Sequence, residues 1–484
     1  MMNAFDYFFE KTSDLDKIFL VGNESITFKD LYNTSLNLSS WIAEEFGHNH
    51  HIVLISVNNL FFIKIYLAIL KSGNICIPLD PAIEKENFNF ILELTNPVLV
   101  FSTNNLKRKL SNDQYKFITP EDSVFSEGRI ISEKENKGFE EKECAEIIFT
   151  SGSQGKPKGV MISHSNIIAN TGSILNYLEL SETDRMLVVL PFYYCYGLSL
   201  LHTHLRTGGS IVLNNAFIFL GTVIKNLSDY ECTGFAGVPS HFQILLRMSD
   251  SFKKHSFPDL KYVTQAGGKL APVFIDEFRE SFPEIKFYVM YGQTEATARL
   301  SYLPPDIYEK KKGSIGKAIP GVEIKVVNRE GENVTAGETG EIIAKGKNVM
   351  MGYFRDNLCT QKVIRDGWLH TGDIGTIDED GFIYLIARIN EIIKVRGIRI
   401  NPKEIEEIIS RLPEVIDCHI VGVEDKIEGE TLKASVYITK GSSGKLDANI
   451  IKQHCARYLA LYKVPKIFEI KEDLKFSSTG KKII

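Results

Sequence analysis

The pattern of residues 51–79 constrains the fold more than any other stretch of the sequence. An apolar run at His51–Val57 indicates a buried strand, the run at Leu60–Lys71 indicates a helix, and Ile75–Leu79 indicates a second strand. A strand, a helix and a strand in this order form a βαβ unit, which requires a parallel sheet. The N-terminal part of the chain is therefore expected to be an α/β lobe.

Three later parts of the chain have different patterns. Short apolar strands alternate with helices over Met186–Gln265, which predicts a second α/β lobe. Over Gly313–Ile386 the hydrophobic period becomes two, with glycine-containing turns, which indicates mainly antiparallel β structure. Beyond Arg388 a compact pattern of helices and strands follows, in which Asn401 and Pro402 are expected to start a helix. This last part is expected to be a separate small domain.

A loop rich in glycine and hydroxyl residues lies between two further apolar runs. Residues 150–159, Thr-Ser-Gly-Ser-Gln-Gly-Lys-Pro-Lys-Gly, follow one predicted strand and precede another, and Ser165 is expected to cap the helix that comes next. Free backbone amides, hydroxyls and two ammonium groups are suited to a polyphosphate. Pro157 excludes a Walker loop, because that motif has Ser or Thr after its lysine. Taken alone, the loop could equally be a surface hairpin.

Composition narrows the class of protein. A chain of 484 residues is expected to form about two to four structural units. With 56 basic and 61 acidic residues there is no basic excess for a nucleic acid backbone. Seven scattered cysteines without a Cys-x-x-Cys pair favour reduced thiols over disulfides or a zinc site. The sequence has no signal-peptide pattern and no run of 18 apolar residues, so we expect a cytoplasmic protein without a membrane span.

Five stretches in chain order resemble the adenylate-forming (AMP-binding) superfamily, which includes acyl-CoA synthetases, beetle luciferases and peptide-synthetase adenylation domains. They are the loop at 150–159, the Tyr-Gly-Gln-Thr-Glu motif at 291–295, Trp368–Asp373, the segment from Arg388 to Arg399, and Ser477–Lys481. The resemblance implies an α/β fold in which residues 1–388 form a large N-terminal domain of two α/β lobes and a distorted antiparallel β subdomain at about 313–388. Residues 389–484 would form a small, mobile α+β domain joined by a hinge.

The resemblance assigns many of these residues to ATP, AMP and magnesium. Thr294 and Glu295 are expected near the α-phosphate, with Glu295 as a ligand of Mg²⁺. Asp373 resembles the acid that binds the ribose, and Arg388 is expected to contact the ribose or a phosphate at the domain boundary. The implied ATP- and AMP-binding residues are Thr150, Ser151, Gly152, Ser153, Gly155, Lys158, Gly267, Gly268, Tyr291, Gly292, Asp373 and Arg388.

The resemblance also assigns residues to two chemical steps. Lys481 resembles the lysine that bridges the attacking carboxylate and the α-phosphate as the acyl-adenylate forms. For the second step the C-terminal domain is expected to turn about a hinge at Asn390, so that Lys394 and Gly397 face a tunnel for a pantetheine thiol. The implied catalytic residues are Lys481, Thr294, Glu295 and Lys394.

The implied reaction activates an acyl or aryl carboxylic acid with ATP, releases pyrophosphate, and transfers the acyl group to a pantetheine thiol, with coenzyme A as the first choice. The acyl pocket is expected to include Tyr194, Phe235, Ala236 and Gly237. The segment 195–200 has no aspartate that could hold an α-amino group, which argues against an amino acid substrate.

Two alternatives stay open. A ligase that loads an acyl carrier protein would use the same residues and differ in its docking surface. An inactive nucleotide-binding homologue is the second, because Gln154 stands where the family usually has Thr. Lys269 stands where the family usually has Ala or Ser, and is interpreted as a surface lysine or as an added cation near the substrate or nucleotide.

Overall fold

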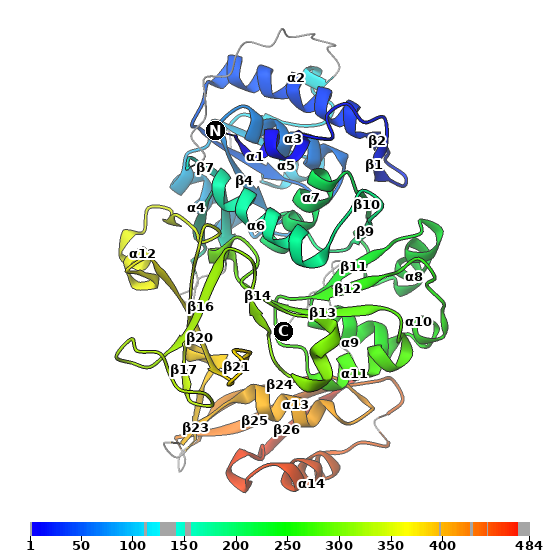
Figure 1. Ribbon diagram of the computed structural model, residues 1–484, viewed down its shortest axis with the longest axis vertical. Helices are drawn as coiled ribbons and strands as arrows, with labels where there is room; N and C mark the ends of the chain where they lie inside the picture. The colour runs from blue at the N-terminus through cyan, green and yellow to red at the C-terminus, as the bar shows by residue number, and fades with distance from the viewer. Residues whose placement is uncertain are drawn as a thin grey trace.

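The computed structural model describes residues 2–110, 114–125, 142–150, 156–395, 398–425, 429–442 and 444–472. Two α/β lobes and a β-rich subdomain form a large N-terminal part, and a smaller C-terminal domain lies at one end of the molecule (Figure 1). The expected α/β fold, with a large N-terminal domain and a small C-terminal domain, is confirmed.

The first lobe is built on a seven-stranded sheet of order β18-β8-β7-β4-β3-β5-β6. Strands β3 and β4 are parallel and are joined by α3, so the expected βαβ unit is confirmed. α3 begins after Asn59, whose side chain accepts a hydrogen bond from the Phe62 amide. The elements of this lobe are α2 (Phe28–Phe46), β3 (His51–Ile55), α3 (Leu60–Lys71), β4 (Ile75–Leu79), α4 (Lys85–Thr95), β5 (Leu99–Ser102), α5 (Asn104–Leu110), β6 (Phe117–Ile118), η1 (Ser123–Phe125), β7 (Cys144–Thr150), β8 (Lys158–Ser163) and β18 (Gly352–Tyr353).

The glycine-rich loop connects β7 and β8. These strands are antiparallel, with Thr150 opposite Lys158 at the end of the pair. β18 comes from a distant part of the sequence and pairs with the other edge of β8, so that Tyr353 lies opposite Val160. The two expected strands are confirmed, residues 151–155 between them lie outside the described part of the chain, and Tyr353 is placed on the strand next to β8.

The second lobe has a nine-stranded sheet of order β15-β14-β13-β12-β11-β9-β10-β1-β2. Its central strands, β9 to β13, are parallel to one another, as expected for a second α/β lobe. One hydrophobic core extends through both lobes and includes α7, in which every residue from Tyr196 to Leu205 is buried. The elements are α1 (Ala4–Phe9), β1 (Ile18–Val21), β2 (Ile26–Thr27), α6 (His164–Leu178), β9 (Arg185–Val188), α7 (Cys195–Thr207), β10 (Ser210–Leu213), α8 (Leu220–Asp229), β11 (Gly234–Gly237), α9 (Pro239–Met248), α10 (Asp250–Lys254), β12 (Tyr262–Gln265), α11 (Pro272–Ser281), β13 (Lys286–Tyr291), η2 (Thr294–Ala296), β14 (Ser301–Leu303), η3 (Pro305–Lys310) and β15 (Lys317–Ala318).

Helix α6 begins earlier than expected. Ser163 is its N-cap: the Ser163 hydroxyl accepts from the Asn166 amide over 3.1 Å, and the Ser163 amide donates to Asn166 Oδ1 over 2.8 Å. The last residue of β8 already has the extended backbone that an N-cap needs. The prediction that Ser165 caps this helix is therefore wrong.

The β-rich subdomain is antiparallel, as expected. Strands β16, β17, β20 and β19 form the sheet in this order, and β21 pairs with the other part of β20. The hairpin between β20 and β21 turns at Asp378, whose carbonyl accepts from the Gly381 amide. The elements are β16 (Val322–Val327), β17 (Thr339–Gly346), α12 (Asn357–Val363), β19 (Ile364–Arg365), β20 (Trp368–Ile377), β21 (Ile383–Arg388) and η4 (Ile389–Glu391).

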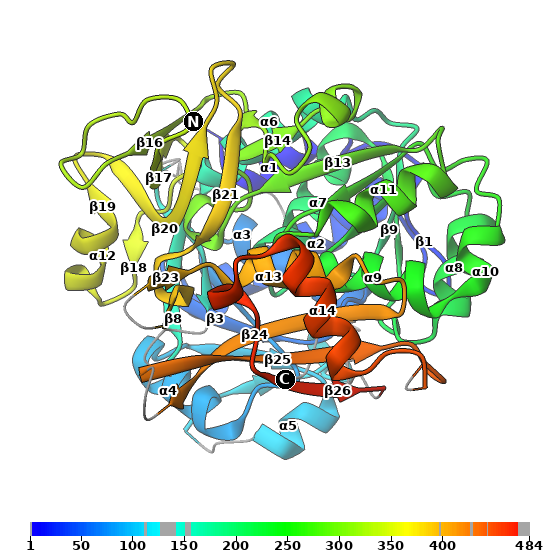
Figure 2. The same cartoon turned by 90° about the horizontal axis from the view of Figure 1, so that it is seen from below.

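The C-terminal domain has a hydrophobic core of its own. Its helix α13 begins as expected, with Pro402 as the first residue and Asn401 as the N-cap that accepts from the Lys403 amide over 2.9 Å. Seen from below, α13, α14, β24 and β25 lie in front of the N-terminal part (Figure 2), and α13 contacts β21 while β24 contacts α9. The elements are β22 (Ile393–Val395), β23 (Ile398–Ile400), α13 (Pro402–Ser410), β24 (Val415–Asp425), β25 (Gly429–Ile438), α14 (Ala448–Tyr458), η5 (Leu461–Lys463) and β26 (Ile467–Lys471).

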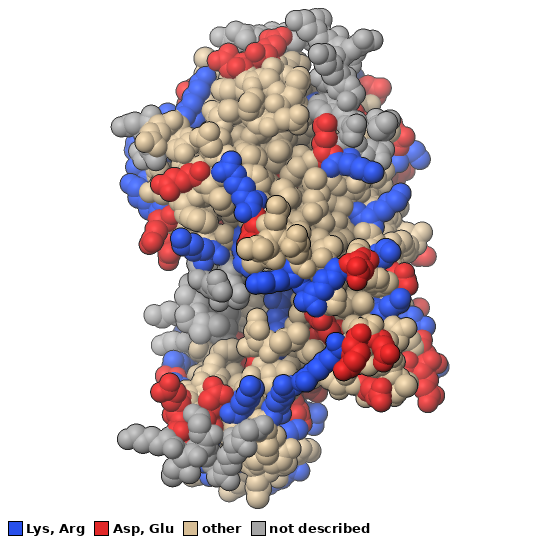
Figure 3. All heavy atoms as spheres, turned by 90° about the vertical axis from the view of Figure 1, so that its left-hand side faces the viewer, with Lys and Arg blue, Asp and Glu red and all other residues tan. Residues whose placement is uncertain are grey.

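Acidic and basic side chains are interspersed on the face of the molecule that Figure 3 shows, with Lys and Arg side chains gathered across its middle. Among the residues that the structure describes, no helix is both long enough and apolar enough to span a membrane.

Candidate active site

A buried carboxylate joins the second lobe to the β-rich subdomain. Asp373 lies on β20 with 4% of its side chain exposed. Tyr291, at the end of β13, donates its hydroxyl to Asp373 Oδ2 over 2.6 Å, and Arg388 Nε lies 3.1 Å from Asp373 Oδ1. Burial raises the pKa of Asp373 above its usual value, against the opposing effects of Arg388 and the Tyr291 hydroxyl. Three residues that the resemblance assigned to the nucleotide are thus in contact, and each carboxylate oxygen has a further lone pair for a ligand.

A second carboxylate meets the glycine-rich hairpin. Glu295 lies in η2, and its Oε1 accepts the Tyr353 hydroxyl over 2.8 Å. Lys158 Nζ lies 5.3 Å from the centre of the Tyr353 ring and donates to Cys359 Sγ over 3.3 Å. Tyr353 therefore brings the lysine of the first lobe and the carboxylate of the second lobe to one place. Sequence reasoning missed Tyr353, because nothing in its local pattern links it to either residue.

Glu295 fits a magnesium ion that is shared with phosphate. Carboxylate oxygen is a preferred ligand of Mg²⁺, which usually keeps several waters and binds through one or two carboxylates and substrate phosphates. The described residues contain no group of three or more His, Cys, Asp or Glu side chains that could hold a metal by themselves. A Mg²⁺ ion at Glu295 would therefore take its remaining ligands from water or from phosphate oxygens.

The turn that carries Thr294 and Glu295 has little freedom. A Cβ at Gly292 would lie 2.0 Å from the carbonyl oxygen of Ala298, so only glycine fits this position. Thr294 Oγ1 lies 3.5 Å from Cys195 Sγ at the start of α7. The turn is therefore packed tightly against the Ala298 backbone and also contacts the first residue of α7.

Asn348 holds the same turn from the β-rich subdomain. Its buried amide donates to the carbonyl oxygens of Ala296, over 3.3 Å, and Arg299, over 2.8 Å. In return, the Thr297 hydroxyl donates to the Asn348 carbonyl over 2.6 Å. Asn348 was not predicted as a site residue, and no motif in the sequence marks it.

A buried guanidinium lies behind the turn. Arg299 is 2% exposed, and its guanidinium lies 3.9 Å from the centre of the Tyr196 ring. The Tyr196 hydroxyl donates to the Thr264 carbonyl on β12 over 3.0 Å. A cation over an aromatic face is favourable, more so when both are desolvated. Arg299 therefore ties the turn to α7 and to β12.

The Gly-Gly pair after β12 forms a tight turn. Gly267 has a φ of +81°, which favours glycine. The Gln265 side chain donates to the Gly268 carbonyl over 2.7 Å. Lys269, the next residue, has only 22% of its side chain exposed and lies 3.6 Å from Glu407 of α13. Lys269 is therefore a half-buried lysine whose ammonium pairs with a carboxylate of the C-terminal domain.

The four residues expected in the acyl pocket lie on β11 and at the start of α7. Phe235, Ala236 and Gly237 are buried, and Phe235 packs against the Phe242 ring at a centroid distance of 5.9 Å. Tyr194 is half-buried at the N-cap position of α7. Their role in holding an acyl group stays a prediction.

The hinge and the thiol-tunnel lysine lie on the C-terminal side of β21. Asn390 is exposed in η4, which connects β21 to β22. Lys394 is exposed on β22, and its backbone amide donates to Glu430 Oε2 over 3.0 Å. Six predicted residues lie outside the described part of the chain, and their roles stay predictions: Ser151, Gly152, Ser153, Gly155, Gly397 and Lys481.

A buried polar cluster lies behind the glycine-rich hairpin. Glu146 on β7 accepts the Tyr66 hydroxyl over 2.9 Å, and the same hydroxyl lies 2.7 Å from His202 Nε2 on α7. Burial raises the pKa of Glu146 to about 7 and lowers the pKa of His202 to about 3. Because Tyr66 has one hydroxyl hydrogen, a neutral His202 that donates from Nε2 satisfies all three groups. The cluster links β7, α3 and α7, and no sequence pattern indicated it.

The two lobes bring the Glu295 carboxylate and Lys158, at the start of β8, together at Tyr353. The model of the AMP-binding enzymes matches residues 8–354, and the model of the AMP-binding enzyme C-terminal domain matches residues 404–481. Because the first match covers more than half of the chain, the chain belongs to the AMP-binding enzyme family. The resemblance found from the motifs is confirmed.

Similar proteins share most of the chain. Oxalate–CoA ligase from Arabidopsis thaliana is 28% identical over 498 residues, which cover 98% of this chain and 95% of that protein. A long-chain-fatty-acid–CoA ligase from Yersinia pestis is 33% identical over 345 residues, which cover 70% of this chain and 60% of that protein. These names agree with the expected class, an AMP-forming acid–thiol ligase.

One solved relative is similar in several complexes. The o-succinylbenzoate CoA synthetase (MenE) from Bacillus subtilis with its acyl-adenylate intermediate OSB-AMP has a TM-score of 0.86 at 25% identity, covering 100% of this chain and 97% of that chain. Its complex with ATP and a magnesium ion also has a TM-score of 0.86. A double mutant bound to the product analogue OSB-NCoA has a TM-score of 0.73 at the same identity and coverage. The backbone of this chain thus follows the acyl-adenylate complex more closely than the product-analogue complex.

Proposed function

We propose that the chain joins a carboxylic acid to coenzyme A by way of an acyl-adenylate. The observation that carries the proposal is the meeting of Lys158 and Glu295 at Tyr353, with 2.8 Å from the Tyr353 hydroxyl to Glu295 Oε1 and 5.3 Å from Lys158 Nζ to the ring centre. An ammonium and a carboxylate on opposite lobes suit a triphosphate, whose charge must be neutralised before another anion can approach it.

In the first step, a carboxylate oxygen of the acid attacks the α-phosphorus of ATP, and the bond to the pyrophosphate oxygen breaks. Lys158 binds the departing phosphates, and Lys481 is proposed to lie between the attacking carboxylate and the α-phosphate. Asp373, held by Tyr291 and Arg388, is proposed to accept from the ribose hydroxyls. Glu295 is proposed to hold Mg²⁺, which when bound would neutralise phosphate charge.

In the second step, the sulfur of a pantetheine thiol attacks the carbonyl carbon of the acyl-adenylate, AMP leaves with the bonding electron pair, and the thiol proton passes to the solvent. We propose residues 1–388 and 389–484 as the two domains that reorient between the steps. η4 (Ile389–Glu391), which carries Asn390 between β21 and β22, supports this boundary. Lys394 and Gly397 are then proposed to line the path of the thiol.

Coenzyme A is the proposed acceptor, because the similar proteins reported above are named as CoA ligases or synthetases. Their acids range from oxalate to long-chain fatty acids, so the proposal extends to an acyl or aryl acid without an α-amino group. Seven free cysteines support a reducing compartment such as the cytoplasm.

The proposal is tested with purified protein, ATP, Mg²⁺ and a panel of aliphatic, aromatic and dicarboxylic acids. At least one acid should stimulate pyrophosphate release, and its thioester should form with coenzyme A. Thioester formation on a holo carrier protein but not on coenzyme A would favour the carrier-loading ligase. If ATP binds but no acid stimulates pyrophosphate release, the chain is a nucleotide-binding homologue and the proposed reaction is refuted.

A further inference from the structure

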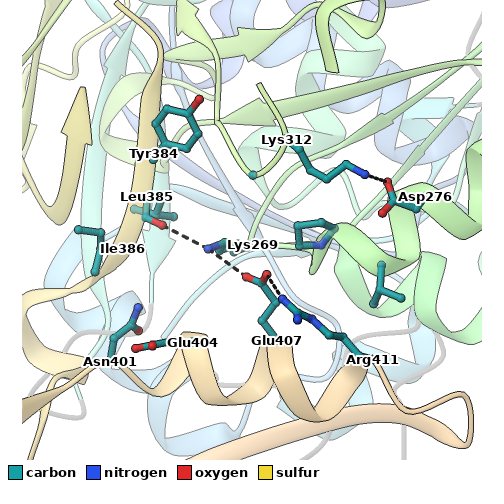
Figure 4. Close-up of a pocket in the computed structure, with 13 residues that line it drawn as sticks. Lys269, Asp276, Lys312, Tyr384, Leu385, Ile386, Asn401, Glu404, Glu407 and Arg411 are labelled. Carbon is teal, nitrogen blue, oxygen red and sulfur yellow. Dashed lines mark hydrogen bonds and ion pairs between the residues drawn. The ribbon is translucent and has the colours of Figure 1, made fainter. Parts of the chain in front are cut away.

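A cavity of about 810 Å³ separates the N-terminal part from helix α13 of the C-terminal domain (Figure 4). Its lining includes Lys269, Lys312, Leu385, Glu404, Glu407 and Arg411. None of the residues predicted to bind the nucleotide or the acid lines it. The cavity therefore lies at the junction between the domains. The distances between its charged side chains depend on how the two domains are oriented.

Lys269 connects three parts of the molecule across this cavity. It follows the Gly267-Gly268 turn of the second lobe, and its ammonium lies 3.5 Å from the Leu385 carbonyl oxygen on β21 and 3.6 Å from Glu407 Oε2 on α13. Figure 4 shows Lys269 and Glu407 pointing toward each other, with Arg411 on the other side of Glu407. Arg411 Nη2 lies 3.6 Å from Glu407 Oε1, so two cations share one carboxylate.

A second contact between the domains is of another kind. Arg247 of α9 has 8% of its side chain exposed and is held by Glu277, 2.7 Å from its Nε. Its Nη1 donates to three carbonyl oxygens that follow α13: Leu412 over 3.0 Å, Pro413 over 2.7 Å and Val415 over 3.1 Å. Arg247 thus binds the segment after α13 through short hydrogen bonds. Lys269, in contrast, contacts Glu407 within α13 through a longer and partly exposed ion pair.

We infer that Lys269 is a positioning residue whose ion pair with Glu407 favours the domain arrangement in which the acyl-adenylate forms. The inference rests on the proposed function. The present arrangement is the one nearer to the acyl-adenylate complex of MenE, with TM-scores of 0.86 and 0.73 for the two complexes. Lys269 precedes η4 in the chain and Glu407 follows it, so a turn of the C-terminal domain about η4 changes the distance between their side chains.

The ion pair between Lys269 and Glu407 is weak enough to break each time the domains reorient in the proposed catalytic cycle. Ion pairs with partly exposed partners contribute little and are weakened by salt, and polar interfaces between domains allow relative motion. Lys269 and Glu407 have 22% and 26% of their side chains exposed. Lys269 directly follows Gly268, whose carbonyl oxygen accepts from the Gln265 side chain. A nucleotide bound against this turn would therefore also affect the position of Lys269 and its ion pair with Glu407.

The test removes the charge while keeping the length of the side chain. Lys269→Met should slow acid-dependent ATP–pyrophosphate exchange about two- to fivefold, the range expected for a partly exposed ion pair, while single-turnover transfer from preformed acyl-adenylate to coenzyme A is unchanged or faster. Lys269→Arg should restore the wild-type ratio of the two rates. The matched control is Lys312→Met, because Lys312 lines the same cavity but pairs over 2.9 Å with Asp276 of the same domain. Equal losses in both half-reactions, or equal effects of the two methionine variants, would overturn the inference.

A distance measurement separates failure of the inference from failure of the proposed function. Fluorophores attached through unnatural amino acids at Lys225 of α8 and Lys452 of α14, both exposed, report the distance between the domains without any turnover. The distance distribution should broaden in Lys269→Met and in Glu407→Gln, and the double variant should add nothing to either single variant. An unchanged distribution in both single variants refutes the ion pair as a determinant of orientation, whether or not an acid substrate has been found.

Discussion

The Tyr291 hydroxyl donates to Asp373 Oδ2 over 2.6 Å, and both side chains are buried. The bond joins the last residue of β13 to the middle of β20, so it connects the nine-stranded sheet of the second lobe to the sheet of the β-rich subdomain. Burial of the carboxylate raises its pKa, whereas the Tyr291 hydroxyl and Arg388 act in the opposite direction. The hydrogen bond therefore orders the carboxylate that is proposed to accept from the ribose hydroxyls.

Tyr291→Phe should weaken ATP binding and lower stability, because Asp373 loses a donor and stays buried. Loss of a hydrogen bond to a charged group costs about 1.5 to 3 kcal/mol, so we expect the free energy of unfolding to fall by that order. The dissociation constant for AMP should rise in parallel, as measured by calorimetry. Tyr302→Phe is the control, because the structure gives its hydroxyl no hydrogen bond within the described residues. Unchanged AMP affinity in Tyr291→Phe would contradict the proposed role of Asp373.

Glu146 predicts a pH dependence of stability. Its pKa is raised from 4.5 to about 7 by burial, so between these values the folded protein keeps a proton that the unfolded chain has lost. Stability from this group is therefore present below about pH 4.5 and is lost as the pH rises to about 7. Glu146→Gln should not show this loss. Between pH 4.5 and 8 its free energy of unfolding should rise relative to that of the wild type by up to roughly 3 kcal/mol, at 1.36 kcal/mol per pKa unit.

The measurement is urea unfolding of both proteins across this pH range. Glu93→Gln, at an exposed position of α4, should track the wild type throughout. His202 and His164 act in the opposite direction, because burial lowers their pKa values to about 3 and about 4. The stability that these two histidines contribute is complete above about pH 6.5 and is lost in acid. Glu146→Gln leaves both histidines in place, so it should show the same loss in acid as the wild type. A constant difference between Glu146→Gln and wild type across the range would show that Glu146 does not titrate in the folded protein.

The sequence alone predicted the parts of the fold that local pattern determines. β3, α3 and β4 followed from apolar runs of the right lengths, and Asn401 with Pro402 marked the start of α13. The cap of α6 was placed wrongly because Ser163 and Ser165 are equally good caps, and only the extent of β8 decides between them. A local sequence pattern extends over a few residues. This is enough to predict a helix or a strand, but it does not predict which distant residues that helix or strand contacts.

The site was predicted only where a motif marked it. Tyr291, Glu295 and Asp373 lie within motifs, and Tyr291 and Asp373 are in contact. Tyr353 and Asn348 were missed, although each bonds directly to the turn at 294–299. Their partners are more than forty positions away in the sequence, so the contacts depend on how β18 and the β-rich subdomain are placed. Lys269 was singled out as unusual, but its partner Glu407 could come only from the packing of α13.

The two lysines of the glycine-rich hairpin should differ in their effect on ATP binding. Lys158 lies over Tyr353 beside Glu295, whereas Lys156 lies 5.3 Å from the centre of the Phe90 ring on α4. Lys158→Met should therefore raise the KM for ATP about tenfold, which corresponds to about 1.4 kcal/mol of lost binding, and Lys156→Met should raise it much less. Initial-rate measurements with saturating acid provide the comparison. Equal effects of the two substitutions would mean that the orientation of Lys158 toward Tyr353 has no bearing on phosphate binding.

Gly292 provides the sharpest steric test of the turn that carries Thr294 and Glu295. In Gly292→Ala the new Cβ would lie 2.0 Å from the Ala298 carbonyl oxygen, so the backbone between them must move. Overpacking of this kind costs about 1 to 3 kcal/mol, and it displaces the two residues proposed to act at the α-phosphate. We expect pyrophosphate exchange to fall by at least about a hundredfold, because small displacements of reacting groups have large effects on rate.

The matched substitution is Gly221→Ala in α8, where a Cβ would have no atom within 4 Å. It should leave exchange unchanged and be neutral or slightly stabilising, since alanine favours a helix over glycine by about 0.5 to 1 kcal/mol. Thermal unfolding measured beside exchange separates the two consequences of Gly292→Ala: the loss of activity should exceed what the fraction of unfolded protein accounts for. A variant that is destabilised but fully active when folded would show that the turn can shift without disturbing Thr294 and Glu295, and the rigid placement proposed for them would fail.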